Sequence, residues 1–376
     1  MSESYDKQES IDDEVLDGIE DQLEGSFVTT CPSCGGNMAF DPESGKLKCP
    51  YCQTEKEVDD GNNVIVEQCF NSALKEGVRT WNDDDIKSFS CQNCGAQLIF
   101  NPNSQAQFCN YCGSSHITMQ EADKTIPPHY LVPFGIGEKD AGKAFKEWIS
   151  KRWLAPNDLK NSYKKDKLLG TYVPHWTYDS HTHSFYTAQR GDYYYVTKTR
   201  VVDGKTETYQ ERQTRWHFVR GDYNRFFDDV LVKGSNKVDQ KLIEKIQPFS
   251  LGKLKTYKPE YLSGFFAERY SISLEDGWEE GKREINDAIR SGVTNKIGGD
   301  TIRFLKIKTA HYNVTFKHIL LPVWITSFYY KNKLYQVMIN GENGKIVGSY
   351  PKSFVKIGLI VLLIVAIAAI GYYFNS

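Results

Sequence analysis

The longest apolar stretch of the chain lies close to its C-terminal end. Residues Ile357–Phe374 form 18 consecutive positions without a charged side chain. At about 1.5 Å per residue, a helix of this length spans about 27 Å, which matches the hydrocarbon core of a bilayer. A buried core helix is the alternative, but such helices rarely lack a polar side. The pattern therefore predicts one transmembrane helix, within a C-terminal tail anchor over residues 353–376.

Positive charge flanks only one end of this stretch. Lys345, Lys352 and Lys356 precede it, and no Lys or Arg follows it. Because positively charged flanks stay on the cytoplasmic side, we expect a single-pass protein of the cell membrane with its N-terminus in the cytoplasm. The first residues are acidic, so we expect no cleaved signal peptide.

The pattern before the anchor predicts two amphipathic helices within a sheet-rich region. Apolar positions recur at helical spacing over Glu138–Trp153, and Ser273–Ser291 begins with a capping serine and stops before Gly292. The rest is rich in Tyr, Phe, Trp, Val and Thr, with Gly-Asp, Asp-Gly and Asn-Gly turns, which is typical of antiparallel sheet. We expect residues 126–352 to form an antiparallel, β-rich α+β domain.

A short internal similarity suggests that this domain contains two related β-units. Tyr172–Trp176 reads Tyr-Val-Pro-His-Trp, and Leu320–Trp324 reads Leu-Leu-Pro-Val-Trp. Both precede aromatic-rich segments that turn and return, ending near Gly191 and Gly341. Chance similarity explains the match about as well.

Eight of the nine cysteines fall into two copies of one pattern. Each copy has a Cys-x-x-Cys pair, fourteen intervening residues and a second pair, which gives the sets Cys31, Cys34, Cys49, Cys52 and Cys91, Cys94, Cys109, Cys112. The intervening residues also match, since Asn37–Pro42 aligns with Gln97–Pro102. We interpret this as an internal duplication.

The cysteine spacing has a direct chemical interpretation. Each intervening segment predicts a hairpin, with its turn at Asp41-Pro42 or Asn101-Pro102, that brings two cysteine pairs to one metal. Four thiolates complete a tetrahedral site, so we expect two structural zinc ions rather than hydrolytic centres. Disulfides and a redox pair are the alternatives, and a reducing cytosol disfavours both.

These assignments divide the N-terminal region. We expect zinc ribbons at residues 26–60 and 89–125, joined by a helical linker over residues 61–88. Within the linker, Val64–Leu74 is the predicted helix, and it contains the ninth cysteine, Cys69, as a buried packing residue. The resulting fold class is multidomain α+β, with two tandem four-cysteine zinc ribbons, the β-rich domain and the membrane helix.

Charge is distributed unevenly along the chain. Residues 1–125 contain 8 Lys+Arg against 23 Asp+Glu, a balance of −15, and residues 126–376 contain 38 against 25, a balance of +13. Residues 1–25 hold ten acids and one lysine, so we expect a disordered tail; an amphipathic helix on a partner is the alternative. The basic part adjoins the predicted membrane helix, where anionic lipid would attract it, unless the acidic tail folds back on it.

The ribbons resemble those of transcription factor IIB and of RNA polymerase subunits, which suggests nucleic acid as a partner. Phosphate binding requires Lys and Arg, yet residues 91–120 contain neither. We therefore expect the ribbons to dock proteins. A membrane-tethered nucleic-acid-binding regulator is the alternative.

No catalytic constellation emerges from the sequence. His181 and His183 alternate on a predicted strand downstream of His175 and could bind a metal, but exposed polar positions explain them equally well. Asp228-Asp229 fits a helix start or a surface. We expect a protein that is not an enzyme, and a hydrolase or transferase is the least favoured alternative.

Taken together, the chain resembles a family of bacterial membrane proteins labelled TFIIB-type zinc-ribbon proteins. Beyond the ribbons, the resemblance lies in Leu131–Phe134, Trp153–Asn157, Gly170–Trp176, Pro259–Phe265 and Ile339–Lys345, and it covers nearly the whole chain from residue 30. His175 departs from the aromatic residue expected there.

This resemblance implies a membrane component of a phage-shock-like envelope system. Such a component would recruit a phage-shock protein A-like protein and a flotillin-like SPFH protein to the membrane. The implied role is that of a non-enzymatic, tail-anchored adaptor.

Overall fold

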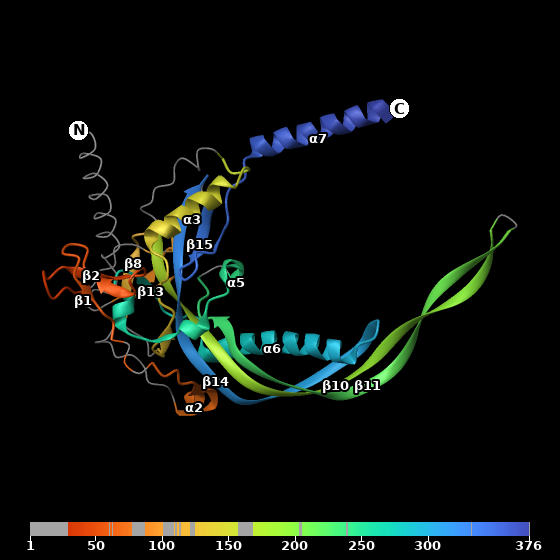
Figure 1. Ribbon diagram of the computed structural model, residues 1–376, viewed down its shortest axis with the longest axis horizontal. Helices are drawn as coiled ribbons and strands as arrows, with labels where there is room; N and C mark the ends of the chain where they lie inside the picture. The colour runs from red at the N-terminus through yellow and green to blue at the C-terminus, as the bar shows by residue number, and fades with distance from the viewer. Residues whose placement is uncertain are drawn as a thin grey trace.

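The chain folds as a mixed α+β protein dominated by sheet (Figure 1). A computed structural model describes residues 29–59, 61, 63–76, 87–100, 109, 111–112, 114–120, 125–156, 168–202, 205–237, 240–331 and 333–375. The described strands form one sheet of twelve strands and a second of four. This confirms the predicted α+β class. The predicted acidic tail, residues 1–25, lies outside the described residues.

Two long antiparallel strands form the centre of the large sheet. They are β10 (Leu169–Val202) and β14 (Thr301–Tyr330). On their outer sides, β11 (Lys205–Lys233) pairs with β10, and β15 (Lys333–Asn340) pairs with β14. A final short strand, β16 (Ile346–Gly348), pairs with β15.

Six strands of the large sheet belong to two similar β-α-β-β units. The first copy is β9 (Tyr130–Leu131), α3 (Glu138–Ser150), β10 and β11, and the second is β13 (Phe266–Glu268), α6 (Leu274–Ile297), β14 and β15. The first strand of each copy pairs in parallel with the long strand of the other copy. β13 pairs with Thr171 and Tyr172 of β10, and β9 pairs with Ile319 and Leu320 of β14. The paired residues of β14 lie 148 positions after those of β10.

Two tryptophans, also 148 residues apart, make the same contact in each copy. Trp176 Nε1 donates a 3.0 Å hydrogen bond to the carbonyl of Ile272, and Trp324 Nε1 donates one of 3.1 Å to the carbonyl of Ile136. Each acceptor precedes the first residue of α6 or α3 by two positions. The pairing and these contacts confirm the two related β-units that the short sequence similarity suggested.

The end of the first unit differs from the prediction. β10 continues past Gly191, and the β10–β11 hairpin forms a long arm that projects from the body (Figure 1). The counterpart of Gly341 is instead Gly234, because each of these glycines donates its N–H to a proline carbonyl, that of Pro322 or Pro174. A Cβ at Gly234 would lie 2.9 Å from the Pro174 oxygen, so only glycine permits this close approach.

Both predicted helices are present, with ends that differ from the prediction. α3 ends at Ser150 rather than Trp153, and α6 continues through Gly292 to Ile297. Gly292 is a packing position, because a Cβ there would lie 2.2 Å from the Tyr223 hydroxyl. The helix ends instead at Gly298, whose φ of 66° favours glycine. The predicted cap is confirmed: the Ser273 hydroxyl accepts a hydrogen bond from the Asp276 N–H.

Short elements connect the two units. In chain order they are α5 (Gln240–Ile246), η2 (Leu251–Lys253), β12 (Lys255–Thr256) and η3 (Pro259–Leu262). The buried apolar side chains of the described residues form three clusters. One surrounds Trp324 and Phe134, a second contains Ile319 and Leu321, and a third lies between α6 and the long strands, around Trp176.

The C-terminal apolar stretch forms a long exposed helix, α7 (Phe354–Asn375). Its first 21 residues are long and apolar enough to span a membrane, and none of the apolar window is buried. The start of α7 is tied to the loop after α3: the Ser353 N–H donates to the Leu154 carbonyl, and Lys356 Nζ donates to the carbonyls of Trp153 and Ala155.

Candidate metal centres

The first cysteine set lies in a small sheet of its own. Its strands are β1 (Thr29–Thr30), β2 (Asn37–Asp41), β3 (Lys46–Lys48) and β4 (Glu55–Lys56). Met38 on β2 and Leu47 on β3 are fully buried, and the turn between these strands follows Asp41, as predicted. Each cysteine pair closes a tight loop, in which the N–H of Gly35 or Gln53 donates to the carbonyl of Cys31 or Cys49.

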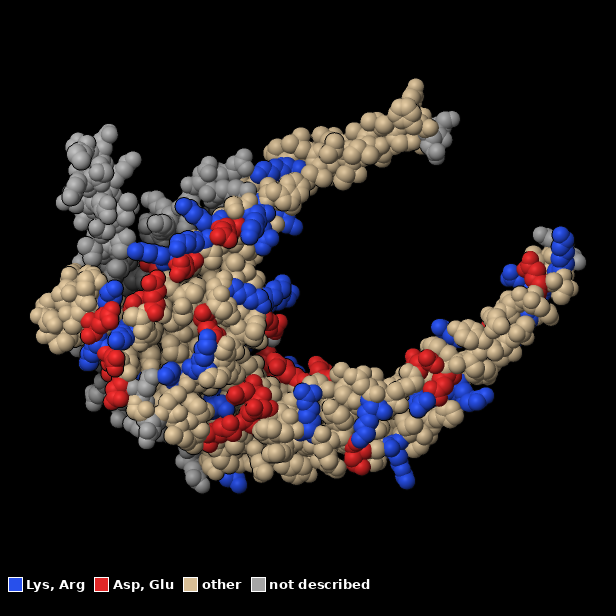
Figure 2. Space-filling model, viewed as in Figure 1, with Lys and Arg blue, Asp and Glu red and all other residues tan. Residues whose placement is uncertain are grey.

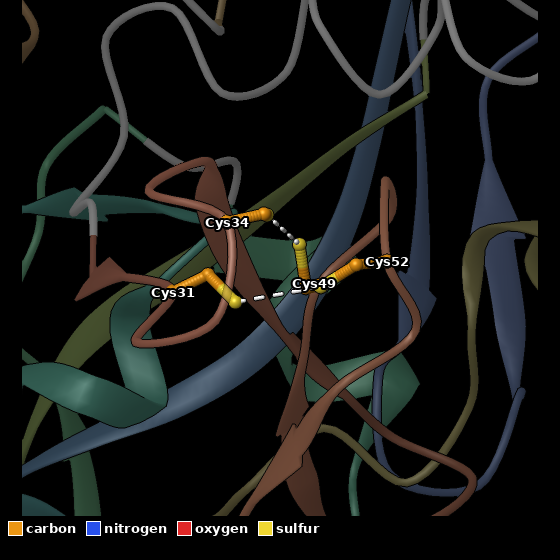
Figure 3. Close-up of side chains that lie close together, drawn as sticks. All are labelled: Cys31, Cys34, Cys49 and Cys52. Atoms are coloured by element: carbon orange, nitrogen blue, oxygen red, sulfur yellow. Dashed lines mark hydrogen bonds between the residues drawn. The ribbon is translucent and has the colours of Figure 1, made fainter.

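The four sulfurs of this set point toward one another (Figure 3). Cys31 Sγ lies 3.6 Å from Cys52 Sγ, and Cys34 Sγ lies 3.5 Å from Cys49 Sγ. In the second set the distances are 3.6 Å for Cys91–Cys112 and for Cys94–Cys109. All four sulfurs of each set lie within 4.8 Å of one another.

These distances distinguish a metal site from a disulfide. Bonded sulfurs would be about 2.05 Å apart, so the eight cysteines are not disulfide-bonded. A tetrahedral ion with four sulfurs at about 2.3 Å separates those sulfurs by about 3.8 Å. Both four-cysteine clusters therefore have the geometry to hold a metal ion.

Two thiols of the second cluster differ in pKa. The hydrogen bond from Cys109 lowers the pKa of Cys94 to about 5, and the same hydrogen bond raises the pKa of Cys109 above its ordinary value. A divalent ion at the centre would stabilise all four thiolates together.

The second ribbon is continuous with the large sheet. Its strands are β6 (Lys87–Cys91), β7 (Gln97–Phe100) and β8 (Ile117–Gln120). β7 pairs with β13, with Ile99 opposite Ala267, and the Arg269 N–H donates to the Gln97 carbonyl at 3.0 Å. The predicted turn at Asn101-Pro102 lies outside the described residues.

The first ribbon contacts the segment just before β13. The Phe40 N–H donates to the Ser263 carbonyl at 2.8 Å, and the Phe40 ring lies 5.2 Å from the ring of Tyr261. Both ribbons therefore hold adjacent parts of one stretch, residues 261–269. The sequence similarity of the two ribbons contains no indication of this shared contact.

A buried carboxyl group lies behind the second cluster. Glu268 on β13 accepts hydrogen bonds of 2.5 Å from the hydroxyls of Tyr111 and Ser235. Burial raises the pKa of Glu268 to about 7. Tyr111 lies between Cys109 and Cys112, so this contact joins a loop of the second cluster directly to β13, which pairs with β10.

The segment between the ribbons is attached to the same sheet by a strand. β5 (Gln68–Cys69) pairs with β14, and α2 (Phe70–Glu76) follows it. The predicted helix Val64–Leu74 is therefore wrong at its start, and Cys69 is exposed rather than buried. The physical reason is that the edge of β14 offers backbone hydrogen bonds to an extended segment.

A buried lysine holds this segment to the sheet. Lys317 is 3% exposed in its side chain, and its Nζ lies 2.9 Å from Glu67, 2.8 Å from Asp229 and 3.7 Å from Asp179. Burial would lower the pKa of Lys317, but hydrogen bonds to Asp229 and Glu67 raise it. The interpretation of Asp228-Asp229 as ordinary surface acids is wrong for Asp229.

Two acidic partners of Lys317 differ in pKa. Burial raises the pKa of Asp179 to about 7, and the hydrogen bond with Asp179 lowers the pKa of Glu67 to about 2. Oxygens of Glu67, Asp179 and Asp228 lie within 4.8 Å of one another. Because the Lys317 ammonium already supplies positive charge there, this group is an ion-pair cluster rather than a metal centre.

The three candidate histidines do not come together. His175 is buried on β10, whereas His181 stacks on Phe226 at 4.4 Å and His183 Nε2 lies 3.4 Å from Asp222. Among the described residues, none of the groups that could hold a metal contains these histidines.

Comparisons with known proteins give one informative match. No family model matches the chain, and no solved structure matches it. The chain is 30% identical over 325 residues to the uncharacterized protein YdjG of Bacillus subtilis (strain 168), a match that covers 86% of this chain and 89% of the relative. The chain therefore belongs to the same family as YdjG.

Proposed function

We propose that this protein is a membrane-anchored adaptor that docks other proteins in the cytoplasm. The observation that carries the proposal is a direct connection. α7 is fixed through Trp153 and Ala155 to the same sheet-rich body that holds both four-cysteine clusters. Anything that binds the ribbons would be held at the membrane surface.

We infer that the bound metal is zinc, in a structural role. Four thiolates favour zinc and fill its tetrahedral coordination, which leaves no position for substrate or water. Metal analysis of the full-length protein, purified under reducing conditions, should find about two zinc equivalents. Cys34→Ser and Cys94→Ser should each lose about one equivalent, and Cys69→Ser, as the matched control, should lose none. Iron or an absence of metal in the wild type would contradict this assignment.

We infer that α7 crosses the cell membrane with the rest of the chain in the cytoplasm. Support comes from Lys345, Lys352 and Lys356, which lie at the N-terminal end of the apolar stretch. A cysteine added after Ser376, in a background whose other thiols are blocked, should react with an impermeant reagent applied from outside. Labelling from the cytoplasmic side alone would contradict this topology.

The adaptor proposal predicts specific partners. The sequence resemblance suggests a phage-shock protein A-like protein and a flotillin-like SPFH protein. Affinity capture of the full chain from detergent-solubilised membranes should retain at least one of them, and Cys34→Ser or Cys94→Ser should retain less than Cys69→Ser does. Capture of neither protein class by the wild type would contradict the proposed partners.

A nucleic-acid-binding regulator is the second candidate, and the arm provides the observation that favours it. Arg212 stacks over Tyr193 at 4.3 Å and Arg215 over Tyr194 at 5.2 Å, and aromatic and guanidinium faces of this kind stack on bases. Residues 192–218 contain 5 Lys+Arg against 4 Asp+Glu, however, which offers little net charge to phosphates. Salt-sensitive DNA or RNA binding at submicromolar concentration would favour the regulator.

A further inference from the structure

Arg152 lies between two aromatic rings beside the start of α7. Its guanidinium carbon is 4.9 Å from the ring centroid of Trp148 and 5.6 Å from that of Tyr350. The two rings are themselves 5.9 Å apart and nearly perpendicular. Trp148 is 6% exposed, so one wall of this site is fixed by the packing of α3. The rings therefore orient the guanidinium before any ligand arrives.

Two hydrogen-bond donors at this position have no acceptor among the described residues. They are Nε of Arg152 and Nε1 of Trp148, and both atoms are buried. No described acidic side chain forms an ion pair with Arg152, and the nearby acid Glu147 lies 4.0 Å from Lys151 instead. Buried donors normally have partners, so this site is suited to a ligand that brings acceptor oxygens and negative charge.

The surroundings are cationic and adjoin α7. Lys and Arg side chains gather where α7 leaves the body (Figure 2). Lys151 and Lys352 are exposed there, and Lys356 is fixed by the carbonyls of Trp153 and Ala155. Trp153 exposes 62% of its surface, and an exposed tryptophan next to a membrane helix suits the bilayer interface.

We propose that the site formed by Arg152, Trp148 and Tyr350, here called the Arg152 site, binds the phosphate of an anionic phospholipid headgroup. The inference rests on the proposed membrane location of α7, because that location puts the site at headgroup depth: Tyr350 precedes Phe354, the first residue of α7, by four positions. A guanidinium binds phosphate oxygens through paired N–H groups. The neighbouring lysines favour a lipid with net negative charge over a zwitterionic one.

Lipid titration of the full-length protein in detergent tests this assignment. The probes are phosphatidylglycerol, phosphatidylcholine and inorganic phosphate, and the readout is the number of lipids retained in native mass spectrometry. The variants are Arg152→Gln and the control Lys139→Gln, which removes the same charge from an exposed position in the first turn of α3. We expect tight retention of phosphatidylglycerol by the wild type and the control, and retention weaker by about fivefold or more in Arg152→Gln.

Several outcomes would overturn the inference. These are equal retention of phosphatidylcholine, displacement of phosphatidylglycerol by millimolar inorganic phosphate, or unchanged retention in Arg152→Gln. Near-ultraviolet circular dichroism checks that each variant is folded, and Arg152→Lys, which keeps the charge but lacks the fork of donors, should be intermediate. Membrane fractionation separates the two proposals. A wild-type protein that is absent from membranes refutes the membrane anchor. A wild-type protein that is in membranes, together with unchanged lipid retention in Arg152→Gln, refutes only the Arg152 site.

Discussion

At the residue scale, the fold depends on acidic side chains that gather around one buried lysine. Lys317 is surrounded by Glu67, Asp179 and Asp229, and the Thr315 hydroxyl lies 2.8 Å from a Glu67 oxygen and 3.1 Å from an Asp179 oxygen. None of these contacts follows from local sequence, because Glu67 and Lys317 are 250 residues apart. A single polar residue in a strand gives no sign of which distant side chain will satisfy it.

Lys317→Met should destabilise the protein by about 3 to 5 kcal/mol. The substitution removes a buried cation from three carboxyl groups, of which Asp179 is itself buried, and leaves their charge uncompensated. Urea unfolding in detergent would measure the effect. The control is Lys306→Met, at an exposed position on the same strand, which should change the free energy of unfolding by less than about 0.5 kcal/mol. Equal effects would mean that the buried ion pairs contribute nothing specific.

Buried histidines should make the fold sensitive to acid. Burial lowers the pKa of His318 to about 3, below its ordinary value of 6.5. Between pH 6.5 and about 3, His318 therefore binds a proton in the unfolded chain but not in the folded chain. Because the unfolded state binds more protons, the free energy of unfolding falls as the pH falls through this range. Asp179 and Glu268, with raised pKa values, oppose this trend, so the His318 contribution is measured by difference.

His318→Asn retains a donor for the Ile126 carbonyl, which His318 Nδ1 contacts at 3.0 Å, and removes the ionisation. Relative to the wild type, its free energy of unfolding should rise by about 1.4 kcal/mol for each pH unit below about 6.5. Melting measured from about pH 7.5 to 5, with the exposed His116→Asn as control, tests this. A difference that stays constant across that range would contradict the explanation.

At the element scale, close packing of α6 on the long strands depends on glycine. A Cβ at Gly277 would lie 2.5 Å from the Tyr178 hydroxyl and 2.9 Å from Trp176 Cδ1. Both rings are fully buried, and the Tyr178 hydroxyl is held by the Leu274 carbonyl at 2.7 Å. The neighbouring rings therefore have little freedom to move.

Gly277→Ala should lower the melting temperature even though alanine favours helix by about 1 kcal/mol. Overpacking of the added methyl group should lower the free energy of unfolding by about 1 to 3 kcal/mol, which outweighs the gain in helix propensity. The matched control is Gly142→Ala in α3, where a Cβ meets open space, and it should stabilise the protein. Stabilisation by both substitutions would show that α6 shifts to accommodate the methyl group.

The same packing explains which element boundaries could be predicted from the sequence. The start of α6 could be predicted, because its signal is local: the Ser273 side chain caps the helix by accepting a hydrogen bond from the Asp276 N–H. Its end could not, because Gly292 lies against Tyr223, which is remote in sequence, and a packing glycine looks the same as a stop signal. β5 is extended because β14 pairs with it, and its own residues contain no such signal.

At the scale of the whole molecule, the two ribbons have equal cysteine spacing but unequal attachment. The cysteine sets themselves could be predicted completely, because each hairpin is short and closes locally. The pairing of β7 with β13 could not, since nothing distinguishes Ile99 from its counterpart Ala39 as a contact to a distant strand. The first ribbon instead forms a separate four-stranded sheet.

Loss of metal from the second cluster should therefore disturb the large sheet. In Cys94→Ser, amide hydrogen exchange should increase across β13 and the adjoining part of β10. In Cys34→Ser, the increase should remain within residues 29–59 and the contacted residues 261–263, because β1–β4 pair only with one another among the described strands and Phe40 bonds to Ser263. Identical exchange patterns in the two variants would mean that the ribbons are attached equivalently.

The pairing of β5 with β14 also sets an order of events during synthesis. Glu67 leaves the ribosome 250 residues before Lys317. At about 5 to 20 residues per second, that interval lasts about 12 to 50 s. The cysteine hairpins can close locally in that time, whereas Gln68 and Cys69 have no strand to join until β14 appears. During this interval the nascent chain carries locally closed cysteine hairpins and an unpaired β5 segment, and a chaperone or a second nascent chain can bind that segment.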